Sequence, residues 1–80
     1  MVHHLKTWPK YYKPIFSGKK RFEIRRNDRD FNVGDVLCLE EYDPETGYTG
    51  RHCHRGITYI LHHSDCPFID LRDYVILSID

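Results

Sequence analysis

The sequence lacks the long hydrophobic runs and the dense cysteines that mark membrane proteins and small secreted proteins. No apolar stretch approaches the roughly 18 residues needed to cross a bilayer, and the first ten residues, MVHHLKTWPK, hold no apolar segment typical of a signal peptide. Three cysteines at irregular spacing do not suit a disulfide framework. We therefore expect a cytoplasmic protein with reduced thiols and no membrane association.

Metal-ligand motifs are also missing, although possible ligands are frequent in the second half of the chain. The candidates are His52, Cys53, His54, His62, His63, Asp65 and Cys66. Zinc sites usually contain pairs such as C-x2-C or H-x3-H, and neither spacing occurs among these residues. In a strand, His52 and His54 would share one face while Cys53 would lie on the other. We expect no metal ion and no cofactor.

Repeats and low-complexity segments are absent as well, and what is present suits one small folded domain over residues 1–80. The hydrophobic share of 40% and the aromatic share of 14% are those of a globular protein. The formal net charge is zero but unevenly spread: residues 1–32 carry nine Lys and Arg against three acids, and residues 33–80 carry three against nine. This split favours an anionic partner for the basic half, or simple attraction between the halves.

Hydrophobic periodicity predicts one short helix near the N-terminus. Tyr12, Ile15 and Phe16 fall at i, i+3 and i+4, which is the spacing of a buried helical stripe. Pro9 suits the first turn of this helix, and Gly18 suits the left-handed position just after its end.

The remaining pattern predicts short strands joined by polar turns. We expect strands over residues 2–7, 21–26, 36–42, 55–61 and 74–79. The turn chemistry of DPETG predicts that the chain returns as a hairpin after the third of these strands. The expected fold class is α+β, mostly β: a small, curled, antiparallel β-barrel with one helix packed on it.

The segment GKKRFEIR, residues 18–25, joins the end of the helix to a strongly charged strand. Alternation puts Phe22 and Ile24 on one face, which we expect to be buried, and Glu23 and Arg25 on the other, which we expect to be open. Lys20 precedes the strand and can converge with Glu23 and Arg25 to bind phosphate and accept a hydrogen bond from a base. The alternative is a solvated face whose ion pair contributes little.

Lys6 and Trp8 lie just before the predicted helix, close in sequence to this charged segment. An exposed tryptophan beside basic side chains can stack on a nucleic-acid base. The alternative is that Trp8 covers the core, because tryptophan is highly buried on average.

Gly18, Lys20, Glu23 and Arg25 match the signature G-x-K-x-x-E-x-R, and the chain resembles the ASCH (activating signal cointegrator homology) domain, a relative of the PUA domain. Nearly the whole chain is similar to a compact, uncharacterised branch associated with bacteria and phages. The resemblance implies a PUA-like barrel with a cleft that faces RNA or a nucleotide.

We therefore expect a stand-alone module that binds RNA or a nucleotide, with an oligomeric state that is left open. The binding residues expected are Lys6, Trp8, Gly18, Lys20, Glu23 and Arg25. The resemblance implies an enzyme as the alternative, a nuclease or an amidohydrolase like those that deacylate modified cytidine, with Lys20 and Glu23 as catalytic candidates. Those amidohydrolases have Thr at the position of Glu23, and their later acidic residue would be Glu40 or Glu41. A module that binds an acidic protein segment is the third possibility.

Overall fold

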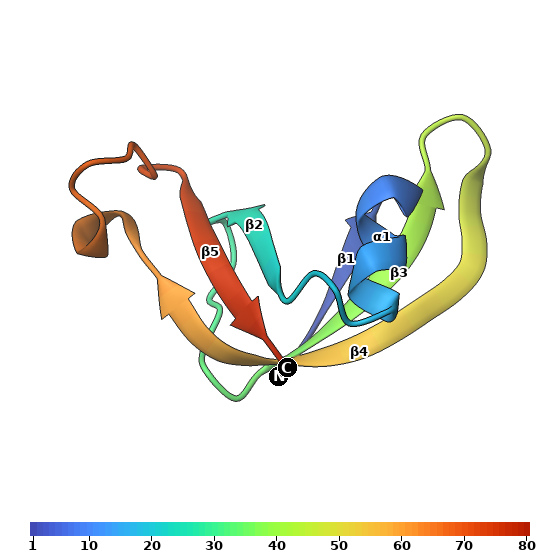
Figure 1. Cartoon of the computed structure of the whole chain (residues 1–80), viewed down its shortest axis with the longest axis horizontal. Helices are drawn as coiled ribbons and strands as arrows, with labels where there is room; N and C mark the ends of the chain where they lie inside the picture. Colours follow the sequence, from blue (N-terminus) through green and yellow to red (C-terminus); the bar gives the residue numbers. More distant parts are fainter.

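A computed structural model describes residues 1–80 and shows one helix packed on an open, five-stranded sheet (Figure 1). The elements in chain order are β1 (Val2–Thr7), α1 (Pro9–Phe16), β2 (Phe22–Arg26), β3 (Val36–Asp43), β4 (Gly47–Leu61), a 3-10 turn (His63–Asp65) and β5 (Tyr74–Ile79). The expected class, mostly β with one helix, is confirmed. No helix of the chain has the length and apolar character needed to span a membrane.

The sheet is mixed, with the strand order β1-β3-β4-β5-β2. Three neighbouring pairs are antiparallel, including the predicted β3–β4 hairpin, whereas β1 runs parallel to β3. The parallel pair is possible because α1 and β2 lie between these strands in the chain, and a parallel connection needs such a long crossover. β4 has 15 residues and serves both halves of the sheet, pairing first with β3 and then with β5 (Figure 1).

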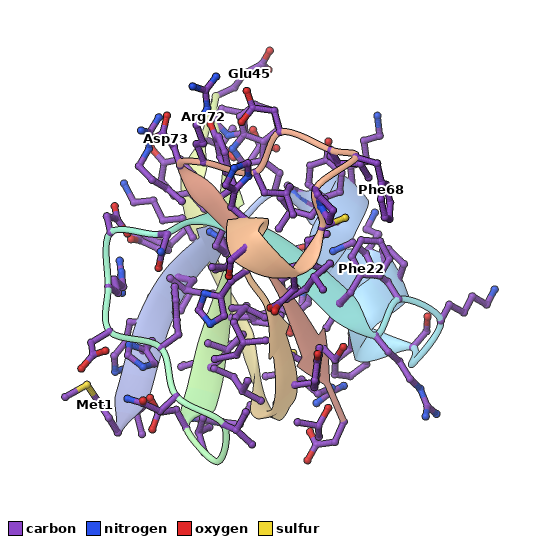
Figure 2. All side chains as sticks on the ribbon, turned by 90° about the vertical axis from the view of Figure 1, so that its left-hand side faces the viewer. Met1, Phe22, Glu45, Phe68, Arg72 and Asp73 are labelled. Carbon is purple, nitrogen blue, oxygen red and sulfur yellow. The ribbon has the colours of Figure 1, made fainter.

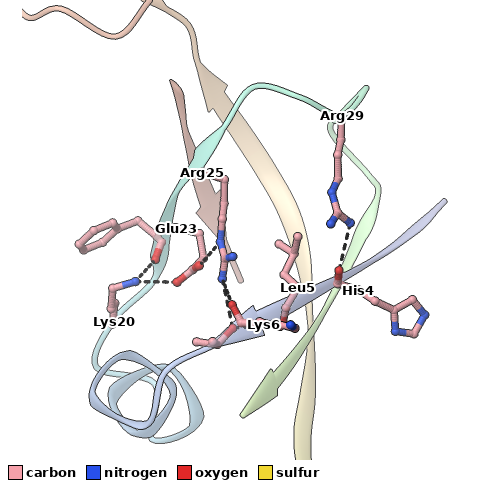
Figure 3. Close-up of polar contacts among 9 residues, drawn as sticks. His4, Leu5, Lys6, Lys20, Glu23, Arg25 and Arg29 are labelled. Atoms are coloured by element: carbon pink, nitrogen blue, oxygen red, sulfur yellow. Dashed lines mark hydrogen bonds and ion pairs between the residues drawn. The ribbon is translucent and has the colours of Figure 1, made fainter. Parts of the chain in front are cut away.

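The predicted barrel is wrong, because the edge strands β1 and β2 do not pair with each other. Two arginine side chains bridge the gap instead (Figure 3). Arg25 on β2 donates from Nη2 to the carbonyl of Lys6 at 3.0 Å, and Arg29 donates from Nη1 to the carbonyl of His4 at 3.0 Å. These bonds satisfy carbonyl groups of an edge strand that no neighbouring strand reaches.

The core lies between α1 and the face of the sheet that α1 covers. Its buried residues are Leu5, Tyr12, Ile15, Phe31, Leu37, Leu39, Cys53, Ile57, Val75, Leu77 and Ile79. The predicted helical stripe is correct for Tyr12 and Ile15 but wrong for Phe16, which is 64% exposed. Phe16 is the last residue of the helix, and its ring stacks beside Tyr12 instead of entering the core. Gly18 follows with a φ of 81°, the left-handed value expected there.

Candidate functional site

A pocket with a volume of about 780 Å³ opens between the start of α1 and strand β2. Its charged lining residues are Lys6, Lys20, Glu23 and Arg25, and its aromatic lining residues are Trp8, Tyr11, Phe22 and Tyr74. Five of the six binding residues expected from the sequence therefore meet in one cavity. The sixth, Gly18, does not line the pocket and acts on it through the backbone.

A buried carboxylate holds two cations at the base of this pocket, an arrangement that we call the Glu23 clamp (Figure 3). Glu23 accepts a bond from Lys20 Nζ through Oε1 and from Arg25 Nε through Oε2, each at 2.7 Å. The Glu23 side chain is 5% exposed, against 18% for Lys20 and 22% for Arg25. Each carboxylate oxygen thus has a cationic partner, which is the condition under which a carboxylate can be buried.

The faces of β2 are the reverse of those predicted. Glu23 lies beside Leu77 of β5 on the buried face. Phe22, which is labelled in Figure 2, is 44% exposed, and Ile24 is 55% exposed. The prediction of an open charged face is therefore wrong. The alternation is as predicted, but alternation alone does not decide which face of a strand turns inward. On β2 the two ion pairs allow the charged face to be buried.

The chain between α1 and β2 folds back tightly and so delivers Lys20 to the clamp. After the left-handed turn at Gly18, the backbone N–H groups of Lys19 and Lys20 both donate to the carbonyl of Pro14, at 2.9 and 3.0 Å. Lys20 Nζ also donates to the carbonyl of Phe22 at 2.7 Å. A residue with a Cβ at position 18 would be strained at this left-handed φ, which explains why glycine is needed at a position outside the pocket lining.

The clamp leaves several donors free for a ligand. An ammonium carries three N–H bonds and a guanidinium carries five. Lys20 uses two of its donors, on Phe22 and Glu23, and Arg25 uses Nε on Glu23 and Nη2 on Lys6 and Thr7. One N–H of Lys20 and both N–H groups of Arg25 Nη1 have no partner in the protein. With two cations and one carboxylate, the clamp keeps a charge of +1.

Lys6 contributes to the pocket in a different way from that expected. Its carbonyl oxygen accepts the bond from Arg25, but its ammonium lies over the ring of Tyr42, 4.5 Å from the centroid, with Tyr48 at 5.8 Å. These tyrosines belong to the β3–β4 hairpin. Lys6 lines the pocket, and its part in binding stays a prediction.

Aromatic rings form the rest of the pocket wall. Trp8 is 53% exposed, so it does not cover the core, and Tyr11, Phe22 and Tyr74 are between 42% and 44% exposed. Lys20 Nζ lies 4.5 Å from the ring centroid of Phe22 and 5.8 Å from that of Tyr11. Sequence reasoning missed Tyr11 and Tyr74. Tyr11 follows Trp8 by one helical turn and could have been found, whereas Tyr74 reaches the site only through the pairing of β5 with β2.

The acidic residues considered for a deacylase, Glu40 and Glu41, lie outside the pocket lining. Glu41 has a fully buried side chain that accepts bonds from Thr49 Oγ1 at 2.8 Å and Arg51 Nε at 2.7 Å. Burial favours a raised pKa for Glu41, but these two bonds outweigh it and the pKa is lowered. Thr49 and Arg51 belong to β4, and Glu41 lies at the bulge where β3 pairs with β4. The role of Glu41 is therefore to hold the hairpin together.

The structure does not bring the seven ligands considered in the sequence into one group. Cys53 is buried in the core, whereas His52 and His54 are exposed. The three side chains that do cluster are His4, Cys38 and Glu40, which were not considered together.

Comparisons place the chain among proteins without an assigned role. The chain belongs to the family described as a domain of unknown function, DUF3850, whose profile matches residues 2–79. It is 38% identical over 76 residues to the "Uncharacterized 12.9 kDa protein in GpA 3'region" of Escherichia phage P2. The matched region covers 95% of the chain and 65% of that relative, so the chain spans just under two thirds of the relative's length. The expectation of an uncharacterised family with a phage member is confirmed.

Proposed function

We propose that this DUF3850 domain is an ASCH-type and PUA-like module that binds single-stranded RNA or a nucleotide in the pocket between α1 and β2. The observation that carries the proposal is that exposed aromatic faces and unused cationic N–H donors share one cavity. The ASCH part rests on the four signature residues: three of them, Lys20, Glu23 and Arg25, form the clamp, and Gly18 makes the turn that delivers Lys20.

In this proposal a base stacks on Trp8 while its phosphate binds the free donors of Lys20 and Arg25. Base stacking on an aromatic side chain contributes about 1–3 kcal/mol and tolerates any base. A guanidinium edge and an ammonium are both suited to phosphate oxygens. Glu23 has both oxygens engaged, so its part is to fix the direction of the two cations.

The pocket favours a splayed single strand over a duplex. Its volume of about 780 Å³ lies within the range of small-ligand pockets, and such a cavity can receive an unstacked nucleotide. RNA-binding modules that read single strands use the same combination of aromatic rings and basic groups. A duplex would keep its bases stacked and would offer the pocket only its backbone.

Trp8 also provides the test, because it is the single tryptophan of the chain. Titration with a single-stranded RNA oligonucleotide and with nucleoside monophosphates should quench its fluorescence to saturation. If the ligand engages one or two phosphates, the log–log salt slope should lie between about −0.7 and −1.4.

Two variants decide whether the pocket is the site. By anisotropy of labelled RNA, Trp8→Ala should weaken binding by about 5- to 150-fold, the equivalent of one lost stacking contact. Tyr59→Ala is the matched control, because Tyr59 is 56% exposed and lies outside the pocket lining. Equal affinities of the two variants, or no saturable binding by the wild type, would remove the proposed site.

A single contact favours the enzyme as the second candidate function. Lys20 Nζ and Glu23 Oε1 are 2.7 Å apart in the pocket, which is the distance needed for proton transfer between an acid and a base. Product analysis of the same incubations, with RNA and with acylated cytidine, separates the two functions. Turnover that is lost in Glu23→Gln while binding is kept would replace the binding module with a hydrolase.

A further inference from the structure

The half of the sheet formed by β1, β3 and β4 has a second group of reactive side chains, on the face opposite to α1. Leu5, Leu39 and Cys53 point into the core, so the residues that alternate with them point outward. The strand register places His4 of β1 directly opposite Cys38 of β3. The outer face therefore joins residues that are more than thirty positions apart in the sequence.

Three ligand atoms meet on this face. One ring nitrogen of His4, Sγ of Cys38 and one carboxylate oxygen of Glu40 all lie within 4.8 Å of one another. His4 Nδ1 and Glu40 Oε2 are 3.8 Å apart. Cys38 is 4% exposed, whereas the side chains of Glu40 and His4 are 35% and 64% exposed. The thiol thus forms the floor of the cluster, and the imidazole and the carboxylate form a rim.

We propose that His4, Cys38 and Glu40 bind a divalent transition metal ion of the zinc type. Ligand atoms around tetrahedral zinc lie roughly 3.3–3.8 Å apart, given bond lengths of about 2.0–2.3 Å. The observed separations, all within 4.8 Å, must shorten to that range, and the partly exposed side chains of His4 and Glu40 are the ones with room to rotate. Sulfur and imidazole ligands select zinc and its neighbours over calcium and magnesium, which prefer oxygen.

The fourth position has a candidate ligand on the next strand. His54 of β4 lies opposite Cys38 in the antiparallel register, on the same outer face, and its ring packs against that of His52 with centroids 5.6 Å apart. Three protein ligands and a water molecule would be the other way to complete a tetrahedron. In either case the ion ties edge strand β1 to β3, because its ligands come from both.

This site departs from the expectation of no metal ion, which was based on ligands close together in the sequence. The cluster depends on the parallel register of β1 and β3, and no spacing motif records such a register. The cluster shares no residue with the proposed RNA pocket, although Lys6, which lines the pocket, lies opposite Glu40 in the strand register.

Cobalt(II) is the probe of choice, because its spectrum reports both thiolate ligation and coordination number. The full chain, freed of metal by a chelator and kept reduced, should bind one Co²⁺. The complex should show a thiolate-to-cobalt charge-transfer band and the intense visible bands of four-coordinate cobalt. Added zinc should displace the cobalt and remove these bands.

Matched variants assign the ligands. Cys38→Ser should abolish the charge-transfer band, whereas Cys66→Ser, which removes another buried cysteine, should retain it. His4→Gln and Glu40→Gln should weaken cobalt binding by at least about 10-fold, the lower end of the cost of losing even a supporting group. His62→Gln changes an exposed histidine outside the cluster and should leave binding unchanged.

The proposal fails if the wild type shows no charge-transfer band under these conditions. It also fails if cobalt binding survives His4→Gln and Glu40→Gln at wild-type strength. His4 and Glu40 both retain solvent contact, so these two variants decide the matter even if Cys38→Ser does not fold. Circular dichroism of each variant establishes that the fold is kept.

Discussion

Glu23→Gln is the substitution that tests the clamp most directly, because it keeps the shape of the side chain and removes its charge. The amide oxygen can accept a bond from only one of the two cations, and the amide N–H2 then faces the other one. Breaking a fully buried ion pair by removing one partner costs about 3–5 kcal/mol. Lys20 and Arg25 retain 18% and 22% exposure, so water still hydrates them in part. We therefore expect a loss of about 2 kcal/mol.

The assay is reversible unfolding by heat or urea, followed by circular dichroism. For a domain of this size, about 2 kcal/mol corresponds to a fall in Tm of roughly 8–16 °C. Glu45→Gln is the control, because Glu45 is an exposed turn residue with no side-chain hydrogen bond, and its change should stay within about 0.5 kcal/mol. If the two variants unfold at the same temperature, the two ion pairs do not hold the carboxylate of Glu23, and the Glu23 clamp does not stabilise the fold.

Two further predictions concern stability. Arg25→Ala removes bonds to Glu23 and to β1 and should lower the free energy of unfolding by about 2–3 kcal/mol. The control Arg26→Ala removes an exposed neighbour and should lower it by about 0.5 kcal/mol or less. Equal losses for the two variants in urea unfolding would contradict the bridge between β1 and β2. Asp35 accepts a bond involving His3 Nε2 at 2.8 Å, which holds the pKa of Asp35 below its usual value of 3.8. The contribution of Asp35 to the free energy of unfolding is therefore complete above that value and is lost as the pH falls through the lowered folded-state pKa. Asp35→Asn should be less stable than the wild type at neutral pH and should lose less stability on acidification. Parallel stability-against-pH profiles of the two proteins would rule this out.

Most of the secondary structure could be predicted from the sequence, because most elements have a strong local signal. Strand β4 is the exception, because it begins at Gly47 and not at residue 55 as predicted. Val2–Thr7 and Tyr74–Ile79 alternate between apolar and polar residues or run apolar, and both strands have the predicted bounds. The turn DPETG produced the β3–β4 hairpin, with Gly47 at a φ of 92°. Proline at the start and Gly18 at the end fixed the limits of α1. All of these signals act over a few residues.

The arrangement of the strands could not be predicted in the same way, because it depends on pairings between distant segments. The segment from Arg21 to Arg26 alternates equally well with either face inward, and the choice was decided by partners on other elements. The bridge from Arg25 to β1 likewise joins residues 18 and 19 positions apart. The assumption that the apolar face is buried therefore reversed the two faces of β2. The barrel was predicted from the short strands and the resemblance, and it is wrong because β1 and β2 do not pair.

The position of Arg25 links the architecture to the proposed binding. Its Nη2 group bonds to β1, its Nε group bonds to Glu23, and its Nη1 group remains available in the pocket. A phosphate bound to Nη1 would bring an anion to a guanidinium whose Nε and Nη2 groups already connect β2 with β1, the two edge strands of the sheet. Because such a ligand binds the folded chain alone, it raises the free energy of unfolding by RT ln(1 + [L]/Kd), about 2.7 kcal/mol at a hundredfold excess over Kd. A ligand bound beside the gap between β1 and β2 would therefore raise the free energy of unfolding by an amount that its concentration and Kd determine.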